Sequence, residues 1–126
     1  MANECNPLFR PGREITVLAT ATVTGKRCVG VSATRDATTG LIKVAHATAA
    51  GRALGVASAD IASGATGSIK RGGVLPVTSG AGITAGVEVE VGTAGKVITL
   101  ASGKAVGIAV ETVGAADVDC LIAFYE

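Results

Sequence analysis

Glycine placement constrains this chain more than any other feature. Glycines recur roughly every five to ten residues, and the stretches between them are short and rich in Val, Ile and Thr. Glycine weakens helices, whereas β-branched side chains pack well on a pleated surface. Short runs bounded by turn residues are typical of domains with many strands. The sequence therefore predicts an all-β fold, a small Gly/Ala/Val-rich β-barrel or β-sandwich with little helix.

Seven runs fit the strand pattern. The clearest is 87–91, where valines alternate with glutamates so that the two kinds of side chain lie on opposite faces. The other predicted strands are residues 15–23, 28–32, 41–45, 97–100, 105–110 and 120–124. A helical signal is confined to 60–63, a single turn that Gly64 would end.

One segment occurs twice. The sequence GRALGVA at 51–57 returns as GKAVGIA at 103–109, and a looser copy occupies 25–32. Chance similarity among Gly-rich segments is one explanation. The other is that the copies are strands in equivalent places, where the central glycine lets another backbone come close.

Size and charge limit the function classes. A chain of 126 residues suits one domain, and we assign 14–126 to a single β-domain. A net charge of +1 disfavours a free-standing nucleic-acid binder, so no direct nucleic-acid partner is expected. Residues 1–71 nevertheless carry a charge of +5 and 72–126 a charge of −4. Such a difference can orient the docking of identical subunits or of a partner.

The first residues differ from the rest of the chain. Residues 1–13 contain two prolines and no strand pattern, which predicts an extended N-terminal arm. The arm carries Leu8 and Phe9 next to Arg10 and Pro11, and this favours docking of the arm over a frayed terminus. Neither a signal peptide nor a membrane span is visible, so synthesis in a host cytoplasm and no membrane partner are expected.

Reactive side chains are few and scattered. Cys5, Cys28 and Cys120 are far apart in the sequence, and we expect them to be reduced, small apolar residues. His46 is expected to be a structural or exposed side chain. The spacing does not suit a metal site, and no P-loop or nucleophile elbow is present. We therefore expect no enzyme activity and no cofactor or metal.

Two carboxylate pairs are spaced by two residues. They are Glu88 with Glu90 and Asp117 with Asp119. On a strand this spacing puts both carboxylates on one face, most often a solvated face or one that guards a sheet edge.

Several segments together resemble one protein family. They are 15–17, 21–27, 55–60, 72–86, 95–97 and 105–109, in that order and spacing. The chain resembles the capsid cement or head decoration proteins of tailed bacteriophages. The resemblance implies a structural virion protein on the outer surface of the phage head, which stabilises contacts between major capsid protein subunits. It also implies homotrimers at three-fold and local three-fold positions.

Site residues follow from this resemblance and from the composition. Leu8, Phe9, Arg10 and Pro11 are predicted to contact the capsid. Phe124 and Tyr125 are predicted at a subunit interface, where aromatic residues are favoured, although Phe124 could instead close one end of a barrel.

Two other function classes remain open. One is a small β carrier or binding module, which would present a modified lysine such as Lys70 on an exposed hairpin. The other is a fibre-base or adhesin domain, present in few copies at a vertex or tail.

Overall fold

The computed structural model describes residues 13–125 as an almost entirely β structure. The predicted capsid-binding residues of the arm lie outside this range. One turn of 3-10 helix, η1 (Thr93–Gly95), interrupts the strands of the described part. The strands are β1 (Glu14–Ala19), β2 (Cys28–Ala33), β3 (Ile42–His46), β4 (Gly55–Ala57), β5 (Thr66–Lys70), β6 (Gly73–Thr78), β7 (Glu88–Val91), β8 (Val97–Thr99), β9 (Gly107–Ala109) and β10 (Asp119–Phe124).

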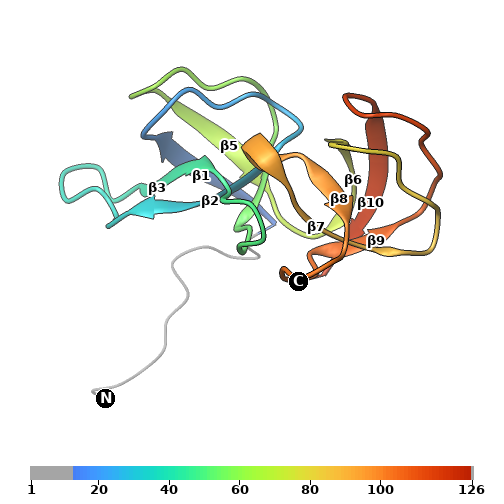
Figure 1. The fold of residues 1–126 in the computed structure, drawn as a ribbon. Helices are drawn as coiled ribbons and strands as arrows, with labels where there is room; N and C mark the ends of the chain where they lie inside the picture. Colours follow the sequence, from blue (N-terminus) through green and yellow to red (C-terminus); the bar gives the residue numbers. More distant parts are fainter. Residues whose placement is uncertain (1–12, 126) are drawn as a thin grey trace, which may run out of the picture.

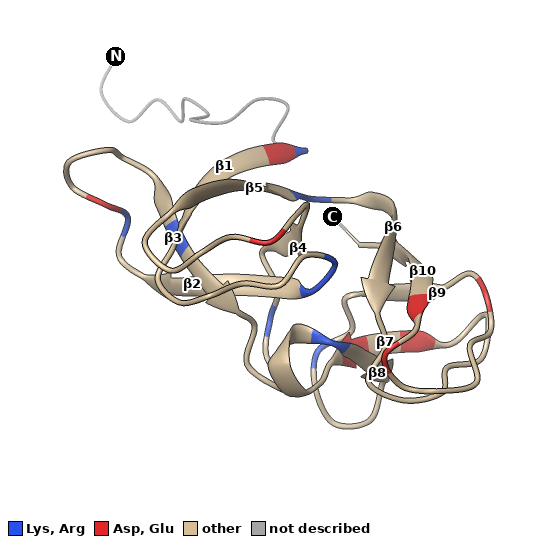
Figure 2. Cartoon of the chain, turned by 90° about the horizontal axis from the view of Figure 1, so that it is seen from above, with Lys and Arg blue, Asp and Glu red and all other residues tan. Residues whose placement is uncertain are grey.

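The strands form two five-stranded sheets that lie side by side (Figures 1 and 2). The first is a closed barrel in the order β1-β3-β2-β4-β5, closed by antiparallel pairing of β1 with β5. The second has the order β6-β10-β9-β7-β8. The all-β prediction and the predicted barrel are confirmed.

The second sheet repeats the first, strand for strand. Written from the other end, its order is β8-β7-β9-β10-β6, which matches β3-β2-β4-β5-β1. In the first sheet β1 also pairs with β3 in parallel, and a parallel bridge between Ser79 and Val97 joins the corresponding places in the second sheet. The described chain therefore consists of two tandem halves with one topology.

The interiors of the two halves match as well. Each strand of the barrel contributes at least one buried side chain, and one from each strand has a counterpart in the second half: in strand order Val17, Val29, Val44, Ala57 and Ile69. The corresponding buried residues of the second half are Val77, Val89, Val97, Ala109 and Ile122. The residue types are the same at all five places, because a barrel this narrow holds only small or branched aliphatic side chains.

The repeated segment lies at equivalent places. Its two tight copies lead into β4 and β9. A Cβ at Gly55 would lie 2.6 Å from the carbonyl oxygen of Lys70, and one at Gly107 would overlap the carbonyl oxygen of Ala123. The predicted role of the central glycine is thus confirmed for both copies. The looser copy forms β2, which pairs with β4 and occupies a different place.

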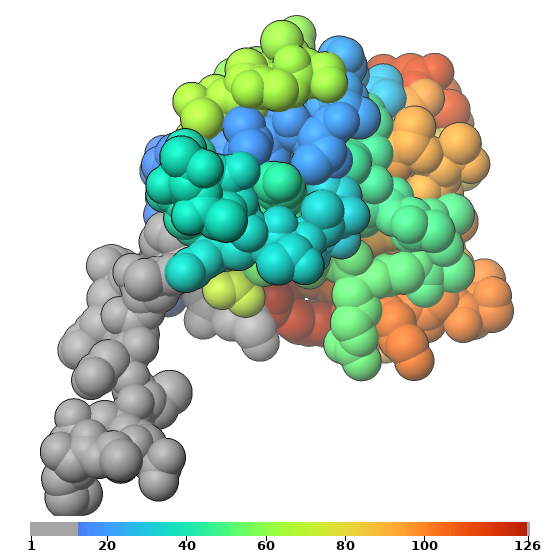
Figure 3. Space-filling model, turned by 90° about the vertical axis from the view of Figure 1, so that its left-hand side faces the viewer, coloured from blue at the N-terminus to red at the C-terminus, as the bar shows by residue number. Residues whose placement is uncertain are grey.

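The two halves share part of their core. The buried cluster around the second sheet also contains Cys28, Ala47 and Val56 from the first half. The amide of Ala50 donates to the carbonyl of Val91 at 2.8 Å, and Figure 3 shows the green segment around residue 50 against the orange second half. The core of the second sheet therefore extends into the first half.

Some strand predictions need correction. The strand predicted at 15–23 ends at Ala19, and Val23 instead makes a separate bridge with Ile61. The helical signal at 60–63 gives no helix, because Ile61 forms this bridge and a turn closed by the hydrogen bond from the amide of Ala65 to the carbonyl of Ala62 follows it. The strand predicted at 105–110 is only Gly107–Ala109. Strands β5 and β6 were missed because glycines and Pro76 interrupt their pattern; Pro76 is tolerated because β6 is the outermost strand of its sheet.

The close approach at Gly107 gives a stability prediction. Gly107→Ala should lower the free energy of unfolding by about 2 kcal/mol or more, because the added methyl group meets backbone atoms of β10 that cannot turn aside. Chemical denaturation of the purified variant measures the loss. Gly114→Ala is the matched control, since a Cβ there meets nothing within 4 Å, and its change should stay within about 0.5 kcal/mol. Equal effects of the two variants would contradict the close-approach role.

Candidate interaction surfaces

The arm joins the folded part beside the start of the second half. Leu8, Phe9, Arg10 and Pro11 lie outside the described residues, which begin at Arg13. The carbonyl oxygen of Arg13 accepts a hydrogen bond from the amide of Arg71 at 2.8 Å, two residues before β6 begins.

Phe124 and Tyr125 lie in different surroundings. Phe124 is partly buried and packs against the core of the second sheet. Tyr125 is 48% exposed, and its hydroxyl donates to the carboxylate of Glu88 at 2.9 Å. That hydrogen bond raises the pKa of Tyr125. Tyr125 is therefore the accessible member of the pair.

Opposite charges meet where the halves adjoin (Figure 2). Lys26 of the first half contacts Asp119 of the second with 2.7 Å between Nζ and Oδ2. Lys96 contacts Asp117 at 2.5 Å, and this hydrogen bond lowers the pKa of Asp117. Asp117 has a φ of 61° and precedes β10, so only Asp119 belongs to the strand. Both aspartates are exposed, as predicted, and each has a lysine partner.

Glu88 and Glu90 do not share a solvated face. Glu88 is exposed, but Glu90 is 3% exposed and its Oε1 accepts a hydrogen bond from the amide of Ala101 at 3.1 Å. Strand β7 lies between β8 and β9, so it guards no edge. The predicted solvated or edge-guarding role is wrong for Glu90, because the loop through Gly103 covers this side chain.

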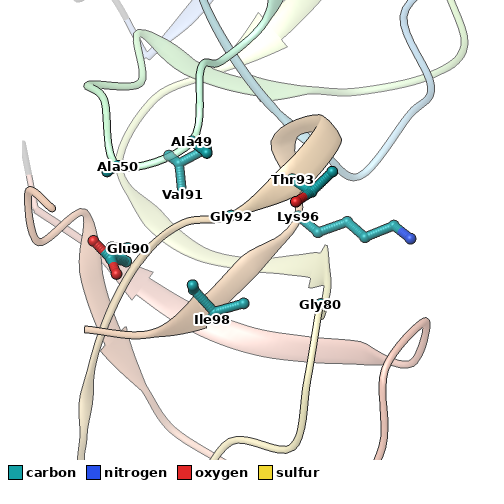
Figure 4. Close-up of a pocket in the computed structure, with 9 residues that line it drawn as sticks. All are labelled: Ala49, Ala50, Gly80, Glu90, Val91, Gly92, Thr93, Lys96 and Ile98. Carbon is teal, nitrogen blue, oxygen red and sulfur yellow. The ribbon is translucent and has the colours of Figure 1, made fainter. Parts of the chain in front are cut away.

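A hollow of about 280 Å³ lies where the halves meet (Figure 4). Among the described residues that line it, Glu90 and Lys96 are the charged ones, and their side chains point away from each other in Figure 4. Both are engaged elsewhere, Glu90 with Ala101 and Lys96 with Asp117. The remaining lining residues are Ala49, Ala50, Gly80, Val91, Gly92, Thr93 and Ile98.

The cysteines within 13–125 are buried and free. Burial raises the pKa of Cys28 to about 12 and, together with the nearby Glu111 carboxylate, raises the pKa of Cys120. Their thiols therefore stay protonated and unreactive, as small apolar residues should. Cys5 lies outside the described residues.

His46 has a structural role. Its Nε2 accepts a hydrogen bond from the amide of Thr24 at 2.9 Å, which ties β3 to the loop before β2. Only a ring that is unprotonated at Nε2 can accept this bond. Partial burial and the positive charge of Arg27 lower the pKa of His46. The expected structural role is therefore confirmed.

Lys70 does not lie at the tip of a hairpin. It ends β5, pairs with Glu14 of β1 and Val56 of β4, and its Nζ lies 3.1 Å from the Glu14 carboxylate. A carrier lysine must be presented to a modifying enzyme on an exposed turn. This placement disfavours the carrier alternative.

Within residues 13–125, no helix is long and apolar enough to cross a membrane. In the same part of the chain, His, Cys, Asp and Glu side chains do not gather into a group of three that could hold a metal ion.

Comparison with known proteins decides the family. The model of a family described as phage cement protein matches residues 9–124. The chain belongs to the phage cement protein family. It is thus a phage structural protein, as the resemblance of its segments had indicated. Among curated proteins, none matches it significantly.

A solved structure shares the fold. The base domain of the head fibre gp8.5 of bacteriophage phi29 matches with a TM-score of 0.71 and 21% sequence identity. The match covers 90% of this chain and 97% of the phi29 chain. At this identity the likeness shows a shared fold.

The lowered pKa of His46 gives a pH prediction. In the folded state the pKa of His46 lies below its ordinary value of 6.5. The neutral ring therefore contributes to the free energy of unfolding, and this contribution is fully present above pH 6.5. This stability is lost as the pH falls through the lower folded pKa. The wild-type protein should therefore lose more stability between pH 7 and pH 5 than His46→Gln, measured by urea denaturation. Equal losses would show that the ring does not titrate on unfolding.

Proposed function

We propose that this protein is a capsid cement, made in the host cytoplasm and bound to the outer surface of the phage head. In this role it contacts the major capsid protein and stabilises contacts between capsid subunits, as homotrimers at three-fold and local three-fold positions. Family membership over residues 9–124 is the observation that carries the proposal. The proposed role is structural and needs no enzymatic step.

The arm supplies the proposed capsid contact. The proposed contact residues are Leu8, Phe9, Arg10 and Pro11. They come shortly before Arg13, whose carbonyl oxygen accepts a hydrogen bond from the amide of Arg71. An extended segment of this kind can add its backbone hydrogen bonds to the edge of a sheet in a partner. Once one arm of a trimer is bound, the other two arms are held near the capsid at a high effective concentration. A trimer would therefore bind more strongly than a single arm.

A head-fibre base is the second candidate. The likeness to the phi29 fibre base is the observation that favours it. Both candidates place the protein on the phage head, but they differ in abundance. A fibre base at a vertex or tail would be present in few copies, whereas a cement would form a lattice over the capsid.

The copy number of this chain in purified virions separates the two. We expect about one copy per major capsid protein subunit, measured by quantitative mass spectrometry with labelled peptides from both chains. A few copies per particle would favour the fibre base instead. Absence from the virion would contradict both candidates.

Deletion of the arm tests the proposed capsid contact. Removing residues 2–12 should leave a folded domain, because the hydrogen-bonded structure begins at Arg13, yet binding to capsids that lack this protein should fall by at least about tenfold. Co-sedimentation with such capsids measures binding, and thermal unfolding confirms the fold.

Two further variants sharpen this test. Removing only residues 2–6 retains the four proposed contact residues and should bind like the full chain. The double variant Leu8→Ser and Phe9→Ser should bind as weakly as the long deletion. Unchanged binding by the long deletion would overturn the capsid-binding arm.

A further inference from the structure

The outer face of the second sheet is apolar. Strand β10 points Leu121 and Ala123 outward, and these residues pair with Pro76 and Val74 of β6. On the other side Ala123 pairs with Ile108 of β9. We call this surface the apolar face; it consists of Val74, Pro76, Ile108, Val110, Leu121 and Ala123.

The apolar face is solvent-accessible in the described part of the chain. The side chains of Val74, Val110 and Leu121 are 55%, 48% and 37% exposed, although each is large and hydrophobic. The amide of Val110 donates to the carbonyl of Leu121 at 3.0 Å, so these residues are neighbours across the sheet. Contiguous exposed apolar surface of this kind usually marks a binding site.

Most equivalent places in the first half are polar. The pair Val74–Ala123 corresponds to Glu14–Lys70, whose charged groups lie 3.1 Å apart. Leu121 and Val110 correspond to Ser68 and Ser58, whose hydroxyls lie 2.6 Å apart. The fold is therefore compatible with a polar surface at these places.

The apolar residue at an equivalent place is covered. Ile108 corresponds to Val56, since the two pair with the corresponding residues Ala123 and Lys70. Val56 is 4% exposed, because it packs in the core of the second sheet. Aliphatic side chains at these places are thus buried in the first half, which indicates that the apolar face also has an occupant.

Carboxylates flank the apolar face. Glu88 is exposed and pairs with Ile108. The Oε1 of Glu111 accepts a hydrogen bond from the amide of Leu121 at 3.0 Å. Among residues 13–125, neither carboxylate forms a salt bridge. The occupant should therefore offer apolar side chains directly beside a positive charge.

The chain has a segment of this chemistry outside the described residues. Leu8 and Phe9 stand directly before Arg10 in the N-terminal arm. Apart from Phe124 and Tyr125, Phe9 is the only aromatic residue of the whole sequence. The arm thus combines large apolar side chains with a cation in three consecutive residues.

The arm leaves the folded part close to the apolar face. The carbonyl oxygen of Arg13 accepts its hydrogen bond from the amide of Arg71, and Figure 2 shows the start of β1 close to the blue stretch that joins β5 to β6. Val74 follows Arg71 by three residues, so the two lie at most about 11 Å apart. Phe9 and Leu8 precede Arg13 by four and five residues, which span about 14 and 18 Å when extended. Both side chains can therefore reach the face.

We propose that the arm of the free protein docks on its own chain, so that Leu8 and Phe9 cover the apolar face and Arg10 faces the carboxylates that flank it. This inference goes beyond the proposed function, because it concerns the chain before it meets a capsid. It also adds a regulation to that function: the arm cannot hold the face and a capsid with the same residues. Capsid binding then releases the arm from the face.

NMR spectra of the free protein test the docking. The double variant Leu8→Ser and Phe9→Ser should shift the amide resonances of Val110 and Leu121, because the face loses its cover. Resonances of the β2–β3 hairpin should not move, since Figure 1 places this hairpin at the other end of the molecule from β6, β9 and β10. The control lacks residues 2–6, retains the docking residues and should leave all these resonances unchanged. Unshifted resonances of Val110 and Leu121 in the double variant would overturn the docking.

Protease cleavage within the arm gives a second readout. The double variant Val110→Ser and Leu121→Ser copies Ser58 and Ser68 of the first half. It should speed chymotrypsin cleavage after Phe9 by at least about tenfold, because the loss of two aliphatic contacts releases the arm. Val118→Ser is the matched control, since Val118 is 43% exposed but lies in the loop before β10, and its cleavage rate should be unchanged. Equal rates for the double variant and the wild type, with both folded by thermal unfolding, would contradict the proposal.

A spin label separates docking within one chain from exchange between copies. Cys28 and Cys120 are buried, so a nitroxide reagent should react at Cys5 of the arm, and mass spectrometry confirms a single label. The label should broaden the resonances of Val110 and Leu121 in the same chain. A mixture of nitroxide-labelled chains with isotope-labelled chains that lack the nitroxide should show weaker broadening. Equal broadening in the mixture would show that copies exchange arms and would overturn docking within one chain.

Capsid binding distinguishes this inference from the proposed function. The Val110→Ser and Leu121→Ser variant should bind capsids at least as strongly as the wild type, because its arm is already released. A tenfold loss of binding would show that the apolar face itself contacts the capsid and would overturn the docking. Same-chain broadening together with normal capsid binding by the chain that lacks residues 2–12 would support the docking and overturn only the capsid-binding arm.

Discussion

Close approach between neighbouring backbones is the constraint on which this structure depends. At Gly55 and Gly107 the next strand lies so near that a side chain would meet its carbonyl oxygen. Sheets that curve this tightly leave a narrow interior, which Val, Ala and Ile fill in the same order in both halves. Larger side chains would force the strands apart, so the scarcity of aromatic residues in the chain follows from this geometry.

The two halves use the same interior but differ at the surface. Cys28, Ala47 and Val56 extend the second core into the first half, and the Lys26–Asp119 contact joins the halves outside it. The repeated topology therefore gives two versions of each surface position. Where the barrel has hydrogen-bonded polar groups, the second sheet has exposed aliphatic ones. One half can thus keep the fold soluble while the other provides a contact surface.

This division suits a protein whose role is to bind other proteins. The thiols of Cys28 and Cys120 are buried, His46 is held by Thr24, and Lys70 is held by Glu14. These side chains therefore serve the fold. The features that remain for partners are the arm anchored at Arg13, the exposed Tyr125 and the apolar face. Membership of the phage cement protein family fits this assignment of roles.

The sequence alone determined the all-β class and the strand of alternating residues at 87–91, because both depend on local side-chain preferences. It also indicated the equivalence of 51–57 and 103–109, since the same close approach requires glycine twice. Only the tertiary structure decided that Glu90 is buried, because a loop distant in sequence covers it. The apolar face likewise depends on which strands become neighbours. Val74, Val110 and Leu121 look like ordinary core residues until β6, β9 and β10 pair, since strand order follows from long-range packing.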